Sequence, residues 1–180
     1  MIKSIETNKG TVVIRDASFA DADQFRDLRL FALQDAPTAF SADLDVNKRH
    51  SKRFWEDRLK PDPHGIIFFA EHDNQLIGIT GIRKGESSKT KHSAGIWGVY
   101  VRPEWRGLRI AEGLLDMCIE WAKLQSVKII KLGVMSTNES AIRLYERIGF
   151  TIYGTEPKAL FYEGQYYDGY QMSISLKEKE

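Results

Sequence analysis

The part of the chain that most constrains the fold is a strand, a long helix and a second strand within residues 94–134. The first strand ends in WGVYV. After RPEWRGLR the apolar residues recur at helical spacing, as Ile110, Leu114, Met117, Trp121 and Leu124. That spacing predicts one apolar stripe along a helix, and VKIIKLGV at 127–134 predicts the next strand. Such a unit is a right-handed parallel crossover, so part of the sheet must be parallel.

The flanking segments predict antiparallel strands. A hairpin with its turn at Asn8–Gly10 opens the chain, and GIIFFAEH and QLIGITGIRK form a second hairpin around Asp73–Asn74. Helices are expected over 21–33, over about 43–59, and over the segment between an Asn138 cap and Gly149. Two strands, FTIYGT and YYDGYQMSISL, finish the domain. We expect one mixed α/β domain over residues 1–180, with a mostly antiparallel sheet of about seven strands and about four helices.

Composition excludes several classes of protein. Hydrophobic residues make up 42% and charged residues 28% of the 180 residues, which are globular values. The net charge of +1 provides no broad field that would attract nucleic acid or an anionic membrane. The opening MIKSIETNKG has no apolar secretory core, and runs such as IIFFA are too short to cross a bilayer. We therefore expect a cytoplasmic protein.

The cysteine and histidine residues argue against a metal centre. Cys118 is the single cysteine, and its position on the apolar helix face favours a core residue over a nucleophile. The four histidines show no HxH or HxxxH pairing, so no zinc set is recognisable. We expect no metal.

The segment RGLRIA at 106–111 lies where the strand becomes the helix. The first N–H groups of a helix lack partners and favour an anion. Gly107 lets backbone approach a ligand, and Arg106 and Arg109 add charge, which suits a pyrophosphate. From turn chemistry alone, an ordinary turn with solvated arginines is equally consistent. GxxxxGK[ST] and GxGxxG are both absent, so any phosphates belong to another kind of cofactor.

A second motif, NESAIRLYERIGF, follows at 138–150. With VYVRPEWRG and the pattern Q/R-x-x-G-x-G/A at 106–111, it makes the chain resemble the GNAT superfamily of N-acetyltransferases over nearly its full length. One position departs from the family pattern, because the family's loop usually has glycine where this chain has Arg109. A left-handed conformation there would strain an arginine by roughly 1 kcal/mol or more. We therefore expect Arg109 to be helical, as the second residue of the helix.

The resemblance implies a cleft for acetyl-CoA where the two parallel strands splay apart. The backbone of Val99 and Val101 would bind the pantetheine arm, and a bulge at Trp97–Gly98 would free the amides needed. An amide near Val99 or Tyr100 would face the thioester oxygen. The amides that open the helix would hold the pyrophosphate. The predicted cofactor-binding residues are Val99, Tyr100, Val101, Arg106, Gly107, Leu108, Arg109, Ile110, Ala111, Glu112, Asn138 and Tyr145.

The resemblance also implies the chemistry. A neutral primary amine attacks the thioester directly in a ternary complex, and Tyr145 is the catalytic acid that protonates the leaving sulfur. From helix position alone, core packing is the favoured interpretation of Tyr145, and Asn138 caps its helix, binds the cofactor, or does both. The base is not evident, because residues 93–101 contain no Asp or Glu. His92, Glu71 and a chain of water molecules are the alternatives.

The acceptor is expected to be a small-molecule amine or a peptide or protein amine, lying against the helices at 20–60 and the loop at 155–168. We expect no nucleic-acid or membrane partner and leave a homodimer open. The alternative function is a non-catalytic acyl-CoA-binding module, favoured by the missing carboxylate in the central strand. A nucleic-acid binder using Arg102, Arg106 and Arg109 is disfavoured by the net charge.

Overall fold

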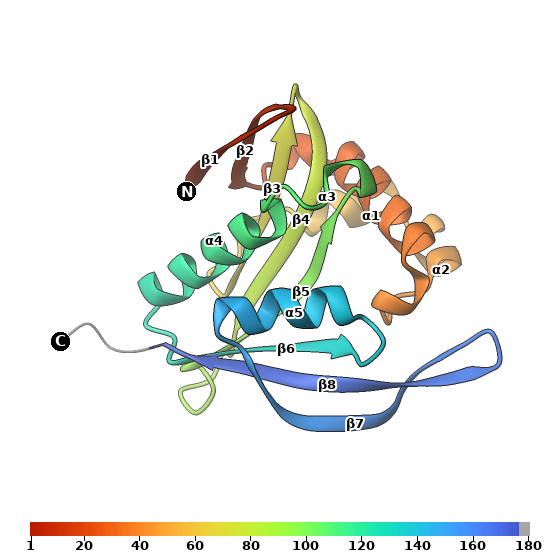
Figure 1. Ribbon diagram of the computed structural model, residues 1–180. Coiled ribbons are helices and arrows are strands. Elements are labelled where there is room, and N and C mark those ends of the chain that lie inside the picture. Colours follow the sequence, from red (N-terminus) through yellow and green to blue (C-terminus); the bar gives the residue numbers. More distant parts are fainter. Residues whose placement is uncertain (177–180) are drawn as a thin grey trace.

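The computed structural model describes residues 1–176, which form one eight-stranded sheet with helices on both faces (Figure 1). The strands are β1 (Ile2–Thr7), β2 (Gly10–Asp16), β3 (Gly65–His72), β4 (Gln75–Lys84), β5 (Ser93–Val101), β6 (Ile129–Met135), β7 (Thr151–Tyr162) and β8 (Gln165–Ser175). The helices are α1 (Ala22–Asp35), α2 (Leu44–Lys48), α3 (Lys52–Asp57), α4 (Ile110–Leu124) and α5 (Glu139–Ile148). Short 3-10 turns are η1 (Phe19–Asp21), η2 (Pro37–Ala39) and η3 (Pro103–Trp105).

The strand order is β1-β2-β3-β4-β5-β6-β8-β7. Within residues 1–176 only β5 and β6 pair in parallel, and α4 connects them, so the predicted crossover unit is confirmed. The mixed α/β fold is confirmed as well, with eight strands where about seven were expected. The helix expected over about 43–59 is two short helices, because the chain breaks after α2 and Ser51 caps α3 by accepting from the Phe54 N–H. None of the described helices is long and apolar enough to cross a membrane.

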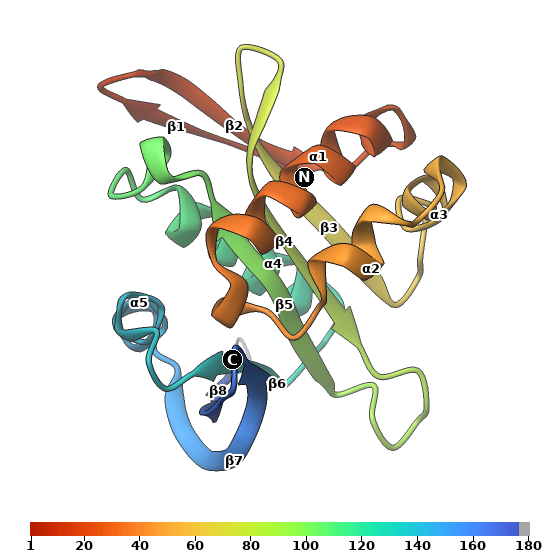
Figure 2. The ribbon, with the colours of Figure 1, turned by 90° about the vertical axis from the view of Figure 1, so that its right-hand side faces the viewer.

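The sheet separates the core into two apolar clusters, and each cluster lies between one face of the sheet and the helices that cover that face. Neighbouring residues of β3 point to opposite faces, so Phe68 packs in the cluster with α4 while Phe69 packs in the cluster with α1 and α3. Figure 2 shows α1, α2 and α3 on the face opposite α4. Each face of the sheet is therefore covered by its own helices and its own apolar cluster.

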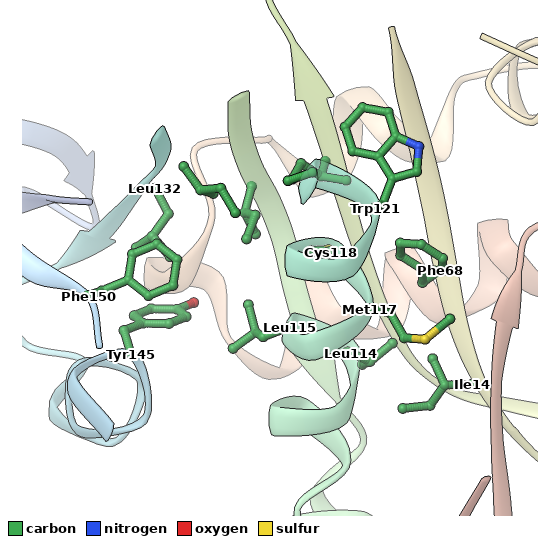
Figure 3. Packing of buried hydrophobic residues seen from close by; sticks show 14 of the residues in the cluster. Ile14, Phe68, Leu114, Leu115, Met117, Cys118, Trp121, Leu132, Tyr145 and Phe150 are labelled. Atoms are coloured by element: carbon green, nitrogen blue, oxygen red, sulfur yellow. The ribbon is translucent and has the colours of Figure 1, made fainter. Parts of the chain in front are cut away.

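The apolar stripe of α4 fills the first cluster as predicted up to Trp121 (Figure 3). Leu124 was expected on the stripe but is 72% exposed, because it is the last residue of the helix and extends beyond the sheet. Cys118 is fully buried, which confirms a core position. Burial raises the pKa of its thiol to about 12.

The central strand β5 contains the predicted bulge. Its pairing with β4 shifts between Tyr100–Ile79 and Trp97–Gly81, which places one extra residue in β5, and Gly98 there has φ +70°. The extra residue reverses the alternation of side chains. Ala94 and Ile96 face α4 before the bulge and Val99 and Val101 face it afterwards, whereas Trp97 and Tyr100 both contact the opposite cluster.

The Trp97 ring leaves no room for a side chain at position 81. A Cβ at Gly81 would lie 2.2 Å from Cζ2 of Trp97, whereas a Cβ at Gly95 would meet no atom within 4 Å. We predict that Gly81→Ala lowers the free energy of unfolding by about 1–3 kcal/mol through overpacking. Gly95→Ala, the matched strand control, should change it by less than about 0.5 kcal/mol. Urea denaturation of both variants checks this, and equal stabilities would contradict it.

Candidate functional site

A cleft opens where β5 and β6 separate. The two strands pair only from Ser93–Ile129 to Gly95–Lys131, although β5 continues to Val101 and β6 to Met135. A cavity of about 450 Å³ lies between the separated segments, with the first turn of α4 and one side of α5 completing its walls. In Figure 2, β5 and β6 diverge toward α5.

All the predicted cofactor-binding residues except Leu108 line this cavity. Leu108 instead packs against the core cluster on the α4 side. Further lining residues come from the segment at 36–40, from β5, η3, β6 and α5, and they include Phe40, Gly133 and Arg147. The β6 residues were implied by the splayed strand pair, and Phe40 lies in the segment at 20–60 that was expected to face the acceptor.

The backbone N–H groups at the start of α4 lack hydrogen-bond partners within the described chain, as expected for a helix that follows a strand. The first hydrogen bond within the helix runs from the Gly113 N–H to the Arg109 carbonyl, at 3.0 Å. In the described chain the N–H groups of residues 107–112 donate to no protein acceptor, and no side chain caps the helix. Residues of this segment line the cavity, so its wall carries the partial positive charge of a helix N-terminus.

Arg109 does not have the conformation expected for it. Its φ and ψ are +59° and +14°, so the residue is left-handed and forms the N-cap of α4 instead of the second helical residue. The position therefore has the backbone conformation of the glycine that the family pattern carries there. An arginine in this conformation stores about 1 kcal/mol or more of strain.

Arg106 is partly neutralised by a residue distant in sequence. Its Nη2 donates to Asp35 at the end of α1, and its Nε donates to the Val101 carbonyl at 3.0 Å. The Tyr100 hydroxyl donates to the same Asp35 carboxylate at 2.9 Å. Burial first, and then this hydrogen bond, raise the pKa of Tyr100. Arg106 was expected to present a free positive charge to the ligand. It instead forms an ion pair with Asp35 that connects the loop to α1.

The strand edge beside the cleft agrees with the expected backbone geometry. Arg102 donates its N–H to Ile77 of β4, at 2.8 Å. Because successive residues of a strand alternate their hydrogen-bonding edges, Val101 and Val99 direct their backbone groups away from β4, toward the cleft. The Val101 carbonyl already accepts from Arg106, which leaves its N–H available.

Tyr145 extends from α5 into the region between the splayed strands. The side chain is 6% exposed, and burial raises its pKa above the ordinary value for a phenol. Its ring packs edge-on against Phe150, at 6.0 Å between centroids, with the hydroxyl pointing away from α5 (Figure 3). Tyr145 is thus both a core residue and a lining residue of the cavity.

Asn138 caps α5 and also lines the cavity. Its Oδ1 accepts from the Ala141 N–H at 3.2 Å and from the Ser140 hydroxyl at 3.1 Å. The side-chain amide N–H groups remain available to a ligand. Gly149 closes the helix with φ +108°, as predicted.

Neither predicted side-chain base faces the cleft. Glu71 accepts from Arg15 Nε at 2.8 Å, and His92 lies by the opposite end of β5, where its carbonyl accepts from Lys128. Neither residue lines the cavity, nor does any residue of the loop at 155–168 that was expected near the acceptor. That loop belongs to the long β7–β8 ribbon. The helical side of the acceptor region contributes Ala36, Ala39 and Phe40.

Comparisons with known proteins agree with this geometry. The L-amino acid N-acetyltransferase AaaT of Escherichia coli is 28% identical over 166 residues, covering 90% of this chain and 96% of its own. The crystal structure of a GNAT acetyltransferase from Streptococcus pneumoniae superposes with TM-score 0.83 at 23% identity, covering 92% of this chain and 99% of that one. The structure of yncA from Salmonella typhimurium with acetyl-CoA has TM-score 0.76 at 22% identity, covering 94% of this chain and 96% of that one. The sequence model of the acetyltransferase (GNAT) family matches residues 26–150, and the chain therefore belongs to that family.

Proposed function

We propose that this protein transfers the acetyl group of acetyl-CoA to a primary amine of a small acceptor. One observation carries the proposal: the unpaired amides of residues 107–112 and the free edge of β5 border the same cavity. The first suits a pyrophosphate and the second suits the amide-containing pantetheine arm. Because the E. coli relative is named for L-amino acids, amino acids belong in the first acceptor panel beside other amines and short peptides.

The proposed binding residues follow from these contacts. The amides of Gly107 to Glu112 would hold the two phosphates, with Arg109 adding charge next to them. The N–H groups of Val99 and Val101 would pair with the pantetheine amides as a neighbouring strand would. A freed amide at the Gly98 bulge would stabilise the oxygen of the thioester as it gains charge.

Acetyl-CoA supplies an activated acetyl group as a thioester. The amine nitrogen forms a bond to the carbonyl carbon, the C–S bond breaks, one proton leaves the nitrogen and one proton ends on sulfur. Tyr145 is the proposed acid, because a buried phenol whose pKa is raised by burial keeps its proton at neutral pH. A chain of water molecules is the proposed route for the proton that leaves the amine, since neither Glu71 nor His92 lines the cavity.

The function is tested by thiol release. Purified protein with acetyl-CoA should release CoA thiol when amines are supplied, and mass spectrometry should find the acceptor heavier by one acetyl group. Micromolar binding of acetyl-CoA with no release over the whole panel would instead identify the non-catalytic module. Absence of acetyl-CoA binding by calorimetry would refute both readings.

Tyr145→Phe tests the acid. Because the phenol contributes a proton and the ring contributes packing, the variant should lose about 10²-fold or more in kcat while its Kd for acetyl-CoA stays within about twofold. Tyr153→Phe is the matched control, because Tyr153 is 56% exposed on β7 and should leave kcat unchanged. If kcat of Tyr145→Phe equals that of the wild type, Tyr145 has no part in proton transfer.

Substitution of Arg109 separates backbone strain from charge. Arg109→Gly should raise the free energy of unfolding by about 0.5–1 kcal/mol, because glycine adopts positive φ without strain. Arg109→Ala should not, because alanine keeps the strain. Both variants should bind acetyl-CoA less tightly, since both lose the charge beside the phosphates. Denaturation and calorimetry check the pair, and equal stability of the two variants would show that the conformation is not strained.

A further inference from the structure

Two arginines on the α1–α3 face of the sheet lack acidic partners. Arg29 lies on α1, and Arg58 follows α3 as its C-cap. Within residues 1–176, neither guanidinium forms an ion pair or a hydrogen bond, and the Arg29 Nη1 atom is buried without a partner. Arg15 and Arg106, by contrast, both pair with carboxylates. What distinguishes Arg29 is that this unpaired nitrogen is buried.

Arg29 lies directly behind Gly98 in the wall of the cleft, whereas Arg58 lines a neighbouring cavity that shares Trp97 with the cleft. A Cβ built on Gly98 would lie 3.9 Å from Nη1 of Arg29. The Arg29 Cζ lies 4.6 Å from the centre of the Phe40 ring, and the Arg58 Cζ lies 5.2 Å from the Trp97 ring. Gly98, Phe40 and Trp97 all line the cavity.

A charged nitrogen that is buried without a partner, as Arg29 Nη1 is, is costly, so its retention calls for an explanation. Burial first, and then the neighbouring charge of Arg58, lower the pKa of Arg29 to about 10. Burial lowers the pKa of Arg58 as well. With a pKa of about 10, Arg29 remains positively charged at neutral pH. The half-buried Arg29 lies over the Phe40 ring and the more exposed Arg58 lies over Phe54 and Trp97, and both guanidiniums provide donors that match a carboxylate.

We infer that Arg29 and Arg58 bind the carboxylate of the acceptor, and that the acceptor is a free α-amino acid. This assignment rests on the proposed acetyl transfer. The short distance from Arg29 to the Gly98 bulge favours an α-amino acid, because its amine and carboxylate are attached to one carbon. Two guanidiniums around one carboxylate also leave a net positive charge, which favours the neutral, nucleophilic form of the nearby amine. A local side-chain base is then less necessary.

The experiment compares the twenty L-amino acids with their carboxamides as acceptors. Neutral primary amines and dipeptides with an acidic second residue form the other two arms. For the preferred side chain, wild type should show kcat/KM at least about tenfold higher for the acid than for the carboxamide. Arg29→Gln and Arg58→Gln should each lower kcat/KM for the acid by about 10- to 100-fold and remove most of this preference, with the Kd for acetyl-CoA unchanged. Arg53→Gln is the matched control, because Arg53 is an exposed α3 residue and should behave as wild type.

Stability provides a readout that a merely structural role would not reproduce. Arg29→Met should unfold at the same temperature as wild type or higher, because it removes an unpaired buried charge while keeping the apolar stem. Binding of the N-acetyl amino acid to the CoA complex, measured by calorimetry, should weaken in the same variant. This measurement remains informative even for a protein that shows no turnover.

The outcomes separate the two proposals. Equal rates for acids, carboxamides and neutral amines would overturn the carboxylate site and leave acetyl transfer intact, and so would a preference that survives both arginine substitutions. Activity confined to the dipeptide arm would assign the arginines to an acidic peptide side chain and would also overturn the amino-acid assignment. Lack of acetyl-CoA binding would refute the proposed function itself.

Discussion

The short length of the parallel pairing between β5 and β6 is the constraint on which the rest of the site depends. Pairing stops at Gly95 and Lys131, so the facing edges beyond it cannot satisfy each other. Polar backbone groups that lose a partner need another acceptor or donor, whether solvent or ligand. The bulge at Gly98, the free amides that open α4 and the inward side of α5 all lie along this gap. A ligand that resembles a peptide at one end and carries phosphates at the other matches this arrangement.

The extra residue in β5 also connects the two halves of the molecule. Because it reverses the alternation of side chains, Trp97 and Tyr100 contact the α1–α3 cluster while Val99 and Val101 face α4. The backbone of a single strand thus borders the proposed cofactor side, and its Trp97 and Tyr100 side chains border the proposed acceptor side. Asp35 strengthens the connection, since one carboxylate accepts from both Tyr100 and Arg106.

Local patterns predicted most of the elements, because hydrophobic period and turn residues are properties of neighbouring positions. The crossover and both hairpins followed from such patterns, and the bulge followed from the family resemblance. Contacts between distant segments did not. Asp35 and Arg106 are 71 positions apart, and no periodicity relates them. The pairing of Arg29 with Phe40 and the break between α2 and α3 depend on packing in the same way.

The error at Arg109 has a different origin. Sequence preference argued against positive φ for an arginine, yet the turn from η3 into α4 requires it, and the surrounding structure outweighs a local cost of about 1 kcal/mol. The family pattern carried the correct information in its glycine. When a residue replaces the glycine of a family pattern, as Arg109 does, the backbone can keep the conformation of the glycine and the new residue is strained.

The burial of Cys118 has a practical consequence. This thiol is the single one in the sequence, it is fully buried beside Thr80, and its pKa is raised to about 12. Only the thiolate attacks an aromatic disulfide reagent, so the native protein should give almost no colour of its own. Slow colour development in the absence of acetyl-CoA would report exposure of Cys118, and its rate would measure how often the core opens.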